Sequence, residues 1–331
     1  LAELAALYEG AEPAPVRPYR DHLAWLSGRD TAAAGYAWRR ALAGLAEPTL
    51  LAPAGPADPS GPPETVELAL PETLTAWLGT MARARGLTTN TLVQVAWGIL
   101  LGRITGRDDV VFGATVSGRP PELAGVESMI GLFINTVPVR VRTDPTETVA
   151  ALLTRVEDEQ AALMEHQYLG LADIQRAAGL GELFDTLLVF ENYPDTAGAD
   201  GGLPIADLEG RDATHYPLTL VAEPGERLQL ALAHRAGLLS AEDARDLLVR
   251  LGRVLTAFAA DPDGPVEAID LLTDGERRRV LRDWNATDHD VPATTLARLF
   301  ADQAARTPEA TALVSGDLEL TYRELDARVA R

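Results

Sequence analysis

The 331-residue sequence contains no cysteine and no lysine, so all 29 of its cationic side chains are arginine. Without cysteine, disulfide bonds, thiolate metal ligands and cysteine nucleophiles are excluded. Without lysine, a Walker-type phosphate loop, Schiff-base catalysis and serine–lysine dyads are excluded as well. Any chemistry in this chain must therefore use other groups.

The sequence also lacks long apolar runs and a positive net charge. No run approaches the roughly 20 apolar residues that span a bilayer. The first stretch, LAELAALYEGAEP, has neither the basic start nor the cleavage pattern of a signal peptide, so we expect a cytoplasmic protein. The formal net charge of -20 repels phosphate backbones and anionic lipids. We expect no nucleic-acid partner and no membrane partner.

A complete catalytic motif is missing too. The five histidines show no metal-ligand spacing, so no metal site is expected. Ser117 does not lie in a Gly-x-Ser-x-Gly elbow, because Thr115 occupies the position of the first glycine. The GADGG stretch at 198–202 neither follows a strand closely nor opens a helix, so it is not a dinucleotide fingerprint.

The residues that are present are sufficient for a large core and do not favour global disorder, since 47% are hydrophobic and 24% charged. Residues 110–141 form two apolar strands around a polar, Gly- and Pro-containing insert. Further strands are predicted at 64–70, near 184–190, and in a hairpin that turns at Pro224–Gly225. The predicted helices are 19–45, 71–86, a buried helix from 88, an amphipathic helix with Val149, Leu152, Leu153, Val156 and Leu163, and one capped by Ser240 and Asp243.

The pattern changes near Asp261. A charged helix capped by Thr273 and Glu276 precedes a polar, turn-prone stretch, and then helix, strand, turn, strand and a helix capped by Thr321 follow. We therefore predict a domain at 1–273, a linker at 274–291 and the start of a second domain at 292–331. The sequence begins without Met in a helical pattern and ends inside another, so we expect a fragment of a longer polypeptide.

Four ordered motifs carry a family resemblance. The segment SGRPPELAGVESMIGLFINTVPVRVR, which starts at Ser117, resembles the condensation domains of nonribosomal peptide synthetases. YRDHLAW at 19–25 resembles the Tyr-x-Asp-Tyr-Ala-x-Trp segment of that family, with His22 in place of the usual tyrosine. LVFENYP at 188–194 and GRDATHYPLTL at 210–220 resemble two later motifs. LLTDGERRRVLRDWNAT and LTYRELDARVAR resemble the following linker and the first motif of an adenylation domain.

The resemblance implies a fold like that of chloramphenicol acetyltransferase, with two α/β lobes around a tunnel. This chain would supply the C-terminal lobe, a two-layer sandwich, with the linker and the first elements of an adenylate-forming domain. The family joins a carrier-bound acyl or peptidyl thioester to a carrier-bound aminoacyl thioester. Its partners would be the upstream and downstream carrier domains, which carry phosphopantetheine, and its own adenylation domain, whose remainder would use ATP and magnesium. The chain itself would bind no cofactor.

The catalytic histidine belongs to the motif His-His-x-x-x-Asp-Gly, which the resemblance places ahead of Leu1, so this fragment is expected to be inactive. Two alternatives stay open. In the first, the parent domain is not a catalyst but a degenerate docking platform for the adenylation or carrier domains. In the second, it is an epimerisation or heterocyclisation relative of the condensation domains. The adenylation start at 295–331 counts against epimerisation, and an Asp-x-x-x-x-Asp motif would mark heterocyclisation.

The resemblance also nominates residues. Residues 117–128 would form a floor loop beneath the tunnel, and 200–211 would lie in or near a latch between lobes. Arg119 either steadies the floor loop or, as we favour, pairs with a carboxylate; Asn135 and Thr136 either line the tunnel or make edge-strand hydrogen bonds. The floor-loop and tunnel candidates are Ser117, Gly118, Arg119, Gly131, Asn135 and Thr136. The motif residues with expected structural roles are Tyr19, Asp21, Trp25, Glu191, Asn192, Arg211, Tyr216 and Pro217.

Overall fold

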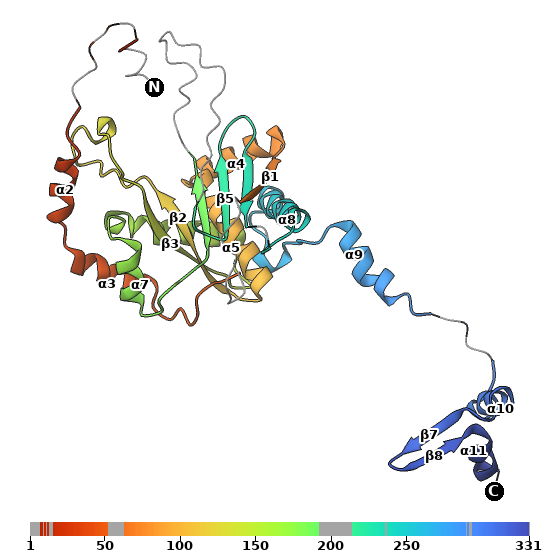
Figure 1. The fold of residues 1–331 in the computed structure, drawn as a ribbon. Helices are drawn as coiled ribbons and strands as arrows, with labels where there is room; N and C mark the ends of the chain where they lie inside the picture. The colour runs from red at the N-terminus through yellow and green to blue at the C-terminus, as the bar shows by residue number, and fades with distance from the viewer. Residues whose placement is uncertain are drawn as a thin grey trace. The chain divides into compact units, whose positions relative to one another are not determined.

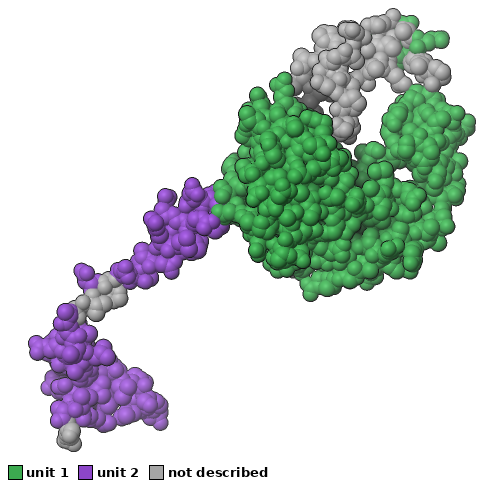
Figure 2. All heavy atoms as spheres, turned by 180° about the vertical axis from the view of Figure 1, so that it is seen from behind, with its two compact units in different colours: residues 1–271 green, residues 272–331 purple. Residues whose placement is uncertain are grey.

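The computed structural model describes residues 7–8, 10, 12, 16–51, 63–191, 214–235, 237–288, 290 and 293–330. The chain divides into two compact units, residues 1–271 and 272–331, which Figure 2 shows in green and purple. Each unit is described by itself.

A mixed sheet organises the first unit. Among the described residues it has six strands in the order β1-β6-β5-β4-β2-β3. The pairs β2–β4 and β4–β5 are parallel, and the other neighbouring pairs are antiparallel. The strands are β1 (Glu64–Ala69), β2 (Asp109–Val116), β3 (Asn135–Arg142), β4 (Thr186–Phe190), β5 (Leu218–Glu223) and β6 (Gln229–His234). All of the predicted strands, including the β5–β6 hairpin, are confirmed.

Four helices bury their apolar sides on one face of this sheet. Helix α5 is apolar all round and is buried along most of its length, as predicted. Its neighbour α8 begins at the predicted capping box of Ser240 and Asp243. These helices and the sheet enclose the main hydrophobic core. The four are α4 (Glu72–Ala84), α5 (Thr89–Thr105), α6 (Val149–Ala161) and α8 (Ala241–Ala260).

A second, smaller core lies on the opposite face, at the β2–β3 end. There α3 (Thr31–Ala41) and α7 (Leu171–Ala178) lie side by side (Figure 1). Trp38 of α3 packs with Val111 and Phe184, while Phe112, one residue along β2, belongs to the main core. Successive strand residues face opposite sides, so these helices add a layer to the predicted two-layer sandwich.

Two local predictions were wrong. The helix predicted over 19–45 is broken into α2 (Arg20–Ser27) and α3, because Asp30 leaves the helix and caps α3 by accepting hydrogen bonds from the backbone of Ala32 and Ala33 at 3.0 and 2.9 Å. The amphipathic helix that was predicted to include Leu163 is α6, and it stops at Ala161. His166 lies in the separate short helix η2 (Met164–His166).

The second unit follows the predicted order of elements. The capping boxes of Thr273 with Glu276 and of Thr321 with Glu324 are both formed. The antiparallel pair β7–β8 carries the predicted turn between its strands. Its elements are α9 (Asp274–Leu281), η5 (Asp283–Asn285), α10 (Leu296–Arg306), β7 (Thr311–Ser315), β8 (Leu318–Thr321) and α11 (Tyr322–Val329).

Candidate functional site

The loop between β2 and β3, residues 117–134, is closed by a turn that only glycine permits. The strands pair in register up to Val116 opposite Asn135. Gly118 has φ +63°, and a Cβ atom there would lie less than 3.0 Å from the carbonyl oxygen of Phe133. Both the backbone conformation and the close approach exclude a side chain. The turn therefore holds the start of the loop against its end.

Arg119 braces the inside of the same loop. Its guanidinium donates to the carbonyl oxygens of Val126, in the short helix η1 (Val126–Ser128), and of Met129, the latter at 3.2 Å. The guanidinium carbon also lies 4.2 Å from the ring centre of Phe133, in cation–π geometry. Among the described residues, Arg119 has no ion pair with the carboxylate that we favoured as its partner. Main-chain carbonyls take its place.

An aromatic cluster joins α2 to the end of the loop. The hydroxyl of Tyr19 donates to the carbonyl of Leu132, and its ring meets the Phe133 ring edge-on at 5.1 Å. The ring centre of His22 lies 4.5 Å from that of Phe133 and, in a stacked arrangement, 5.7 Å from that of Trp25. The cluster fixes helix α2 to the loop.

His22 is only 6% exposed, and its Nδ1 atom has no hydrogen-bond partner among the described residues. Burial lowers the pKa of the His22 imidazole, and the positive charge of Arg119 lowers it further. The ring is therefore neutral at pH 7, and it acts as an aromatic packing element.

Trp25 is held from two sides. Arg29 lies 3.9 Å from its ring centre, and the Tyr168 ring meets it edge-on at 6.0 Å. The Tyr168 hydroxyl donates to the carbonyl of Asp30 at 2.8 Å. These contacts tie α2 to the segment that follows α6.

Two of the sequence motifs meet at one cleft of about 640 Å³. Trp25 comes from the first motif, and Ser117, Gly118 and Arg119 from the second. The end of α6 and the segment that follows it also line the cleft, with Met164 and Tyr168 as their large apolar side chains. The volume of the cleft lies within the range of small-molecule binding sites. The remaining lining residues are Pro120, Pro121, Glu122, Ala161, Ala162, Glu165 and Gln167.

Asn135 and Thr136 do not line this cleft among the described residues. The side-chain amide of Asn135 donates to the carbonyls of Gln167 and Leu169 at 2.7 and 2.9 Å, and its oxygen accepts from the backbone N–H of Thr136 at 2.9 Å. Asn135 thus ties the start of β3 to the segment after α6 that lines the cleft.

Tyr216 packs below the same strand. It is stacked 5.9 Å from Phe184, and its hydroxyl forms a hydrogen bond with Thr136. Burial raises the pKa of Tyr216, the Glu182 carboxylate raises it further, and the hydrogen bond with Thr136 opposes both. Thr136 and Tyr216 therefore serve packing in this region.

Sequence comparison identifies the family. The family model described as Condensation domain matches residues 1–281. This chain belongs to the condensation domain family. Members of this family within nonribosomal peptide synthetases catalyse peptide-bond formation. The mixed α/β fold expected from the resemblance is confirmed by condensation-domain structures.

Relatives and solved structures agree with this assignment. One of the linear gramicidin synthase proteins of Brevibacillus parabrevis is 39% identical over 336 residues, which cover 98% of this chain and 4% of the synthase protein. The nonribosomal peptide synthetase FmoA3, bound to α-methyl-L-serine-AMP, matches with TM-score 0.71 at 25% identity over 98% of this chain and 38% of its own. The complex of the X-domain and OxyB from teicoplanin biosynthesis matches with TM-score 0.67 at 26% identity over 82% of this chain and 65% of its own.

Among the described residues, the other motif residues of the condensation domain do not line the cleft. Asp21 is in the first turn of α2, where a carboxylate complements the helix dipole. The backbone N–H of Glu191 extends the pairing of β4 to the carbonyl of Ala222 at 2.9 Å, and the carbonyl of Pro217 accepts from Arg235 at 3.1 Å. Asn192, Arg211 and the expected latch at 200–211 lie outside the described residues.

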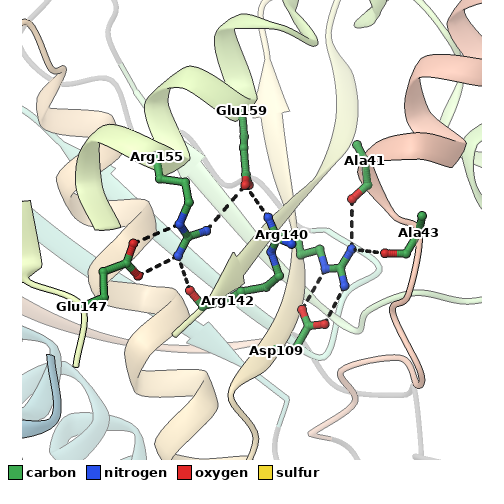
Figure 3. A network of polar contacts seen from close by, with 8 residues as sticks. All are labelled: Ala41, Ala43, Asp109, Arg140, Arg142, Glu147, Arg155 and Glu159. Atoms are coloured by element: carbon green, nitrogen blue, oxygen red, sulfur yellow. Dashed lines mark hydrogen bonds and ion pairs between the residues drawn. The ribbon is translucent and has the colours of Figure 1, made fainter. Parts of the chain in front are cut away.

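Sequence reasoning missed the polar network along β3, the last strand of the condensation-domain sheet. The guanidinium of Arg140 pairs with both oxygens of Asp109 at 2.8 and 2.6 Å and donates to the carbonyls of Ala41 and Ala43 at the end of α3 (Figure 3). The guanidinium of Arg155 in α6 donates hydrogen bonds to the carboxylate of Glu147 and to the carbonyl of Arg142 (Figure 3). The alternation Val-Arg-Val-Arg in β3 signalled outward arginines, but their partners are distant in sequence.

The cleft-lining residues Met164, Gln167 and Tyr168 were also missed, because the stretch MEHQYLG contains no recognisable motif.

In the described part of the chain, no three His, Asp or Glu side chains are grouped closely enough to hold a metal ion. Across those same residues, no helix combines the length and apolar character needed to cross a membrane.

Proposed function

We propose that this chain is part of a longer nonribosomal peptide synthetase, and that its parent condensation domain joins a carrier-bound acyl or peptidyl thioester to the amine of a carrier-bound aminoacyl thioester. The observation that carries the proposal is the meeting of Trp25 with Ser117–Gly118–Arg119 at one cleft. Two motifs about 90 residues apart in sequence contribute to one site, as a binding function requires. The match covers only 4% of the gramicidin synthase protein, which supports the longer parent.

The chemistry needs positioning more than a cofactor. A thioester already carries the activation for amide formation, so an attacking amine needs orientation and a proton acceptor. This chain contributes the loop at 117–134, which Gly118 and Arg119 hold in one conformation. His22 is neutral but almost fully buried, so it is not the proton acceptor. The sequence contains no adjacent histidine pair, so we expect the chain alone to be inactive.

We further propose that residues 292–331 begin an adenylation domain after a linker at 274–291. The condensation model ends at residue 281, whereas the similarity to the gramicidin synthase covers 98% of the chain. The helix–strand–strand–helix order from α10 to α11 forms a unit of its own with the preceding α9. The rest of such a domain would use ATP and magnesium, and the carrier domains would supply phosphopantetheine.

The proposal predicts a difference between the chain and its parent. Mixed with a donor carrier and an acceptor carrier that are both loaded, the parent synthetase should produce an extended thioester on the acceptor carrier. The 331-residue chain should produce none, because it lacks the paired histidines. Mass spectrometry of the acceptor carrier measures both. Product formation by the isolated chain at the parental rate would contradict the assignment of the catalytic group.

A second candidate function is a docking platform without catalysis. The similarity to the X-domain, which was solved in complex with OxyB, favours it as the alternative. In that case the parent would bind its carrier domains, measured by calorimetry, and form no amide bond. Binding without product, from correctly loaded carriers, would replace the catalytic proposal with this one.

A further inference from the structure

The segment 129–134, at the end of the loop, belongs to no helix or strand. Met129 and Phe133 are 2% and 6% exposed, whereas Ile130 and Leu132 are 68% and 75% exposed. Only part of the segment is thus anchored by apolar burial. Its conformation depends on the side chains that hold its backbone.

Tyr19 makes contact with three consecutive residues of this segment. A Cβ atom on Gly131 would lie less than 3.0 Å from the Tyr19 ring, so the ring occupies the space of the missing side chain. The Tyr19 hydroxyl donates to the carbonyl of Leu132, and the ring packs edge-on against Phe133. Gly131 has an ordinary φ, so the requirement for glycine comes from the Tyr19 ring and not from the backbone.

The same segment supports Ser117–Arg119, the wall of the cleft that comes from the second motif. The carbonyl of Phe133 abuts Gly118, and the Phe133 ring lies under the guanidinium of Arg119. Gly118 and Arg119 line the cleft, whereas Tyr19 does not line it among the described residues. A shift of residues 131–133 must therefore move the wall.

We propose that Tyr19 is a positioning residue for condensation: by clamping Gly131 and Leu132 it holds the Ser117–Arg119 wall of the cleft in its productive conformation. The inference rests on the proposed function, since it assigns Tyr19 a role in that reaction. Displacement of a supporting group by about 1 Å can slow a reaction by about a hundredfold.

The test is a double-mutant cycle in the parent synthetase. The variant Gly131→Ala adds a methyl group that competes with the Tyr19 ring, and should lower kcat/KM for condensation by about tenfold or more. Tyr19→Ala should lower it as well, and Tyr19→Phe, which keeps the ring, should retain more activity. In Tyr19→Ala/Gly131→Ala the methyl group has room, so the second change should cost nothing further. Wild-type activity of Gly131→Ala, or a double variant that multiplies the single effects, overturns the proposal.

A matched control is Gly35→Ala, because a Cβ on Gly35 of α3 meets nothing within 4 Å. Its condensation rate should equal that of the wild type. Adenylation by the parent, measured by pyrophosphate exchange, should be unchanged in every variant and shows that the enzyme is intact.

A second measurement separates the clamp from the proposed function. Chymotrypsin should cleave the 331-residue chain after Leu132 or Phe133 faster in Gly131→Ala and Tyr19→Ala than in the wild type, with the double variant no faster than Tyr19→Ala. If wild-type parent makes no product, the proposed function fails and Tyr19 has no role in it, while these cleavage rates still report the clamp. Equal rates in all variants overturn the clamp itself.

Discussion

Gly118 shows how one residue sets the shape of the loop. Its positive φ and the contact with the Phe133 carbonyl leave no space for a side chain. Gly118→Ala should therefore lower the free energy of unfolding by about 2 kcal/mol through backbone strain. Urea denaturation of the 331-residue chain measures this change. Gly35→Ala, inside helix α3 and without a steric contact, should not lower the free energy of unfolding. An unchanged or higher free energy of unfolding in Gly118→Ala would contradict the turn geometry.

His22 gives the stability a specific dependence on pH. Its pKa is lowered in the folded state from the ordinary 6.5. Above pH 6.5 the imidazole is neutral in both states and the full stability is present. As the pH falls through 6.5 towards the folded pKa, the unfolded chain binds a proton that the folded chain resists, so stability is lost.

His22→Phe should remove that component. Urea unfolding free energies of wild type and variant, compared above and below pH 6.5, should show a smaller loss on acidification in the variant. Gly35→Ala, whose added methyl group meets nothing within 4 Å, serves as the control and should keep the wild-type dependence. An identical loss in His22→Phe and wild type would contradict the assigned environment of His22.

For individual residues, the sequence predicted the members of the candidate site better than it predicted their hydrogen-bond partners. The motif nominated Arg119, but its partners are backbone carbonyls, which every residue has and which leave no signature in a sequence. The same holds for Asn135, whose partners Gln167 and Leu169 lie more than 30 residues away. His22 was visible only as a departure from the family motif.

Among the elements, β3 depends on a charged contact for its attachment to α3. The Arg140 side chain is 9% exposed, whereas its partner Asp109 is 33% exposed. Arg140 also supplies positive charge to the carbonyls at the end of α3 (Figure 3). Its loss leaves Asp109 and these carbonyls without their donor.

Arg140→Ala should therefore cost about 2–3 kcal/mol in the free energy of unfolding, between the values for exposed and fully buried pairs. The matched control is Arg176→Ala in α7, whose ion pair with Asp173 is exposed on both sides and should cost less than about 1 kcal/mol. Denaturant titration of both variants checks the ranking. Equal losses would mean that the network adds nothing beyond a surface ion pair.

Periodicity predicted the elements well where one face or all faces are buried. The continuous apolar residues of α5 and the alternation in β5 and β6 led to the correct assignments. It failed between α2 and α3, because the apolar spacing continues across Gly28 and Asp30 although the backbone breaks there. The end of α6 was missed because Leu163 keeps the helical spacing and packs into the second core after the helix has stopped.

For the whole molecule, the net charge of -20 predicts a response to salt. Repulsion among excess carboxylates opposes the compact state, and about 0.1 M salt shortens its range to about 10 Å. The melting temperature should therefore rise between low ionic strength and about 0.1 M sodium chloride. Calorimetric scans at several salt concentrations test this, and a falling melting temperature would show that attractive ion pairs dominate instead.

The cleft itself was only half predictable. The resemblance nominated Trp25 and the Ser117–Arg119 turn. The lining residues from the end of α6 and the segment after it belong to no motif, so only the folded chain shows that they line the same cleft. Three-dimensional proximity of this kind depends on the whole core. A single sequence carries no direct record of it.

The most direct test of the proposed function is the mass of the species on the acceptor carrier of the parent synthetase, in wild type and in Arg119→Ala, with Arg176→Ala as the control. We predict an extended thioester in wild type and control. In Arg119→Ala, where the loop loses its brace, transfer should be slowed by about tenfold or more while adenylation is unchanged. An unmodified acceptor in the loaded wild type, or transfer at the wild-type rate in Arg119→Ala, would contradict the function proposed for this cleft.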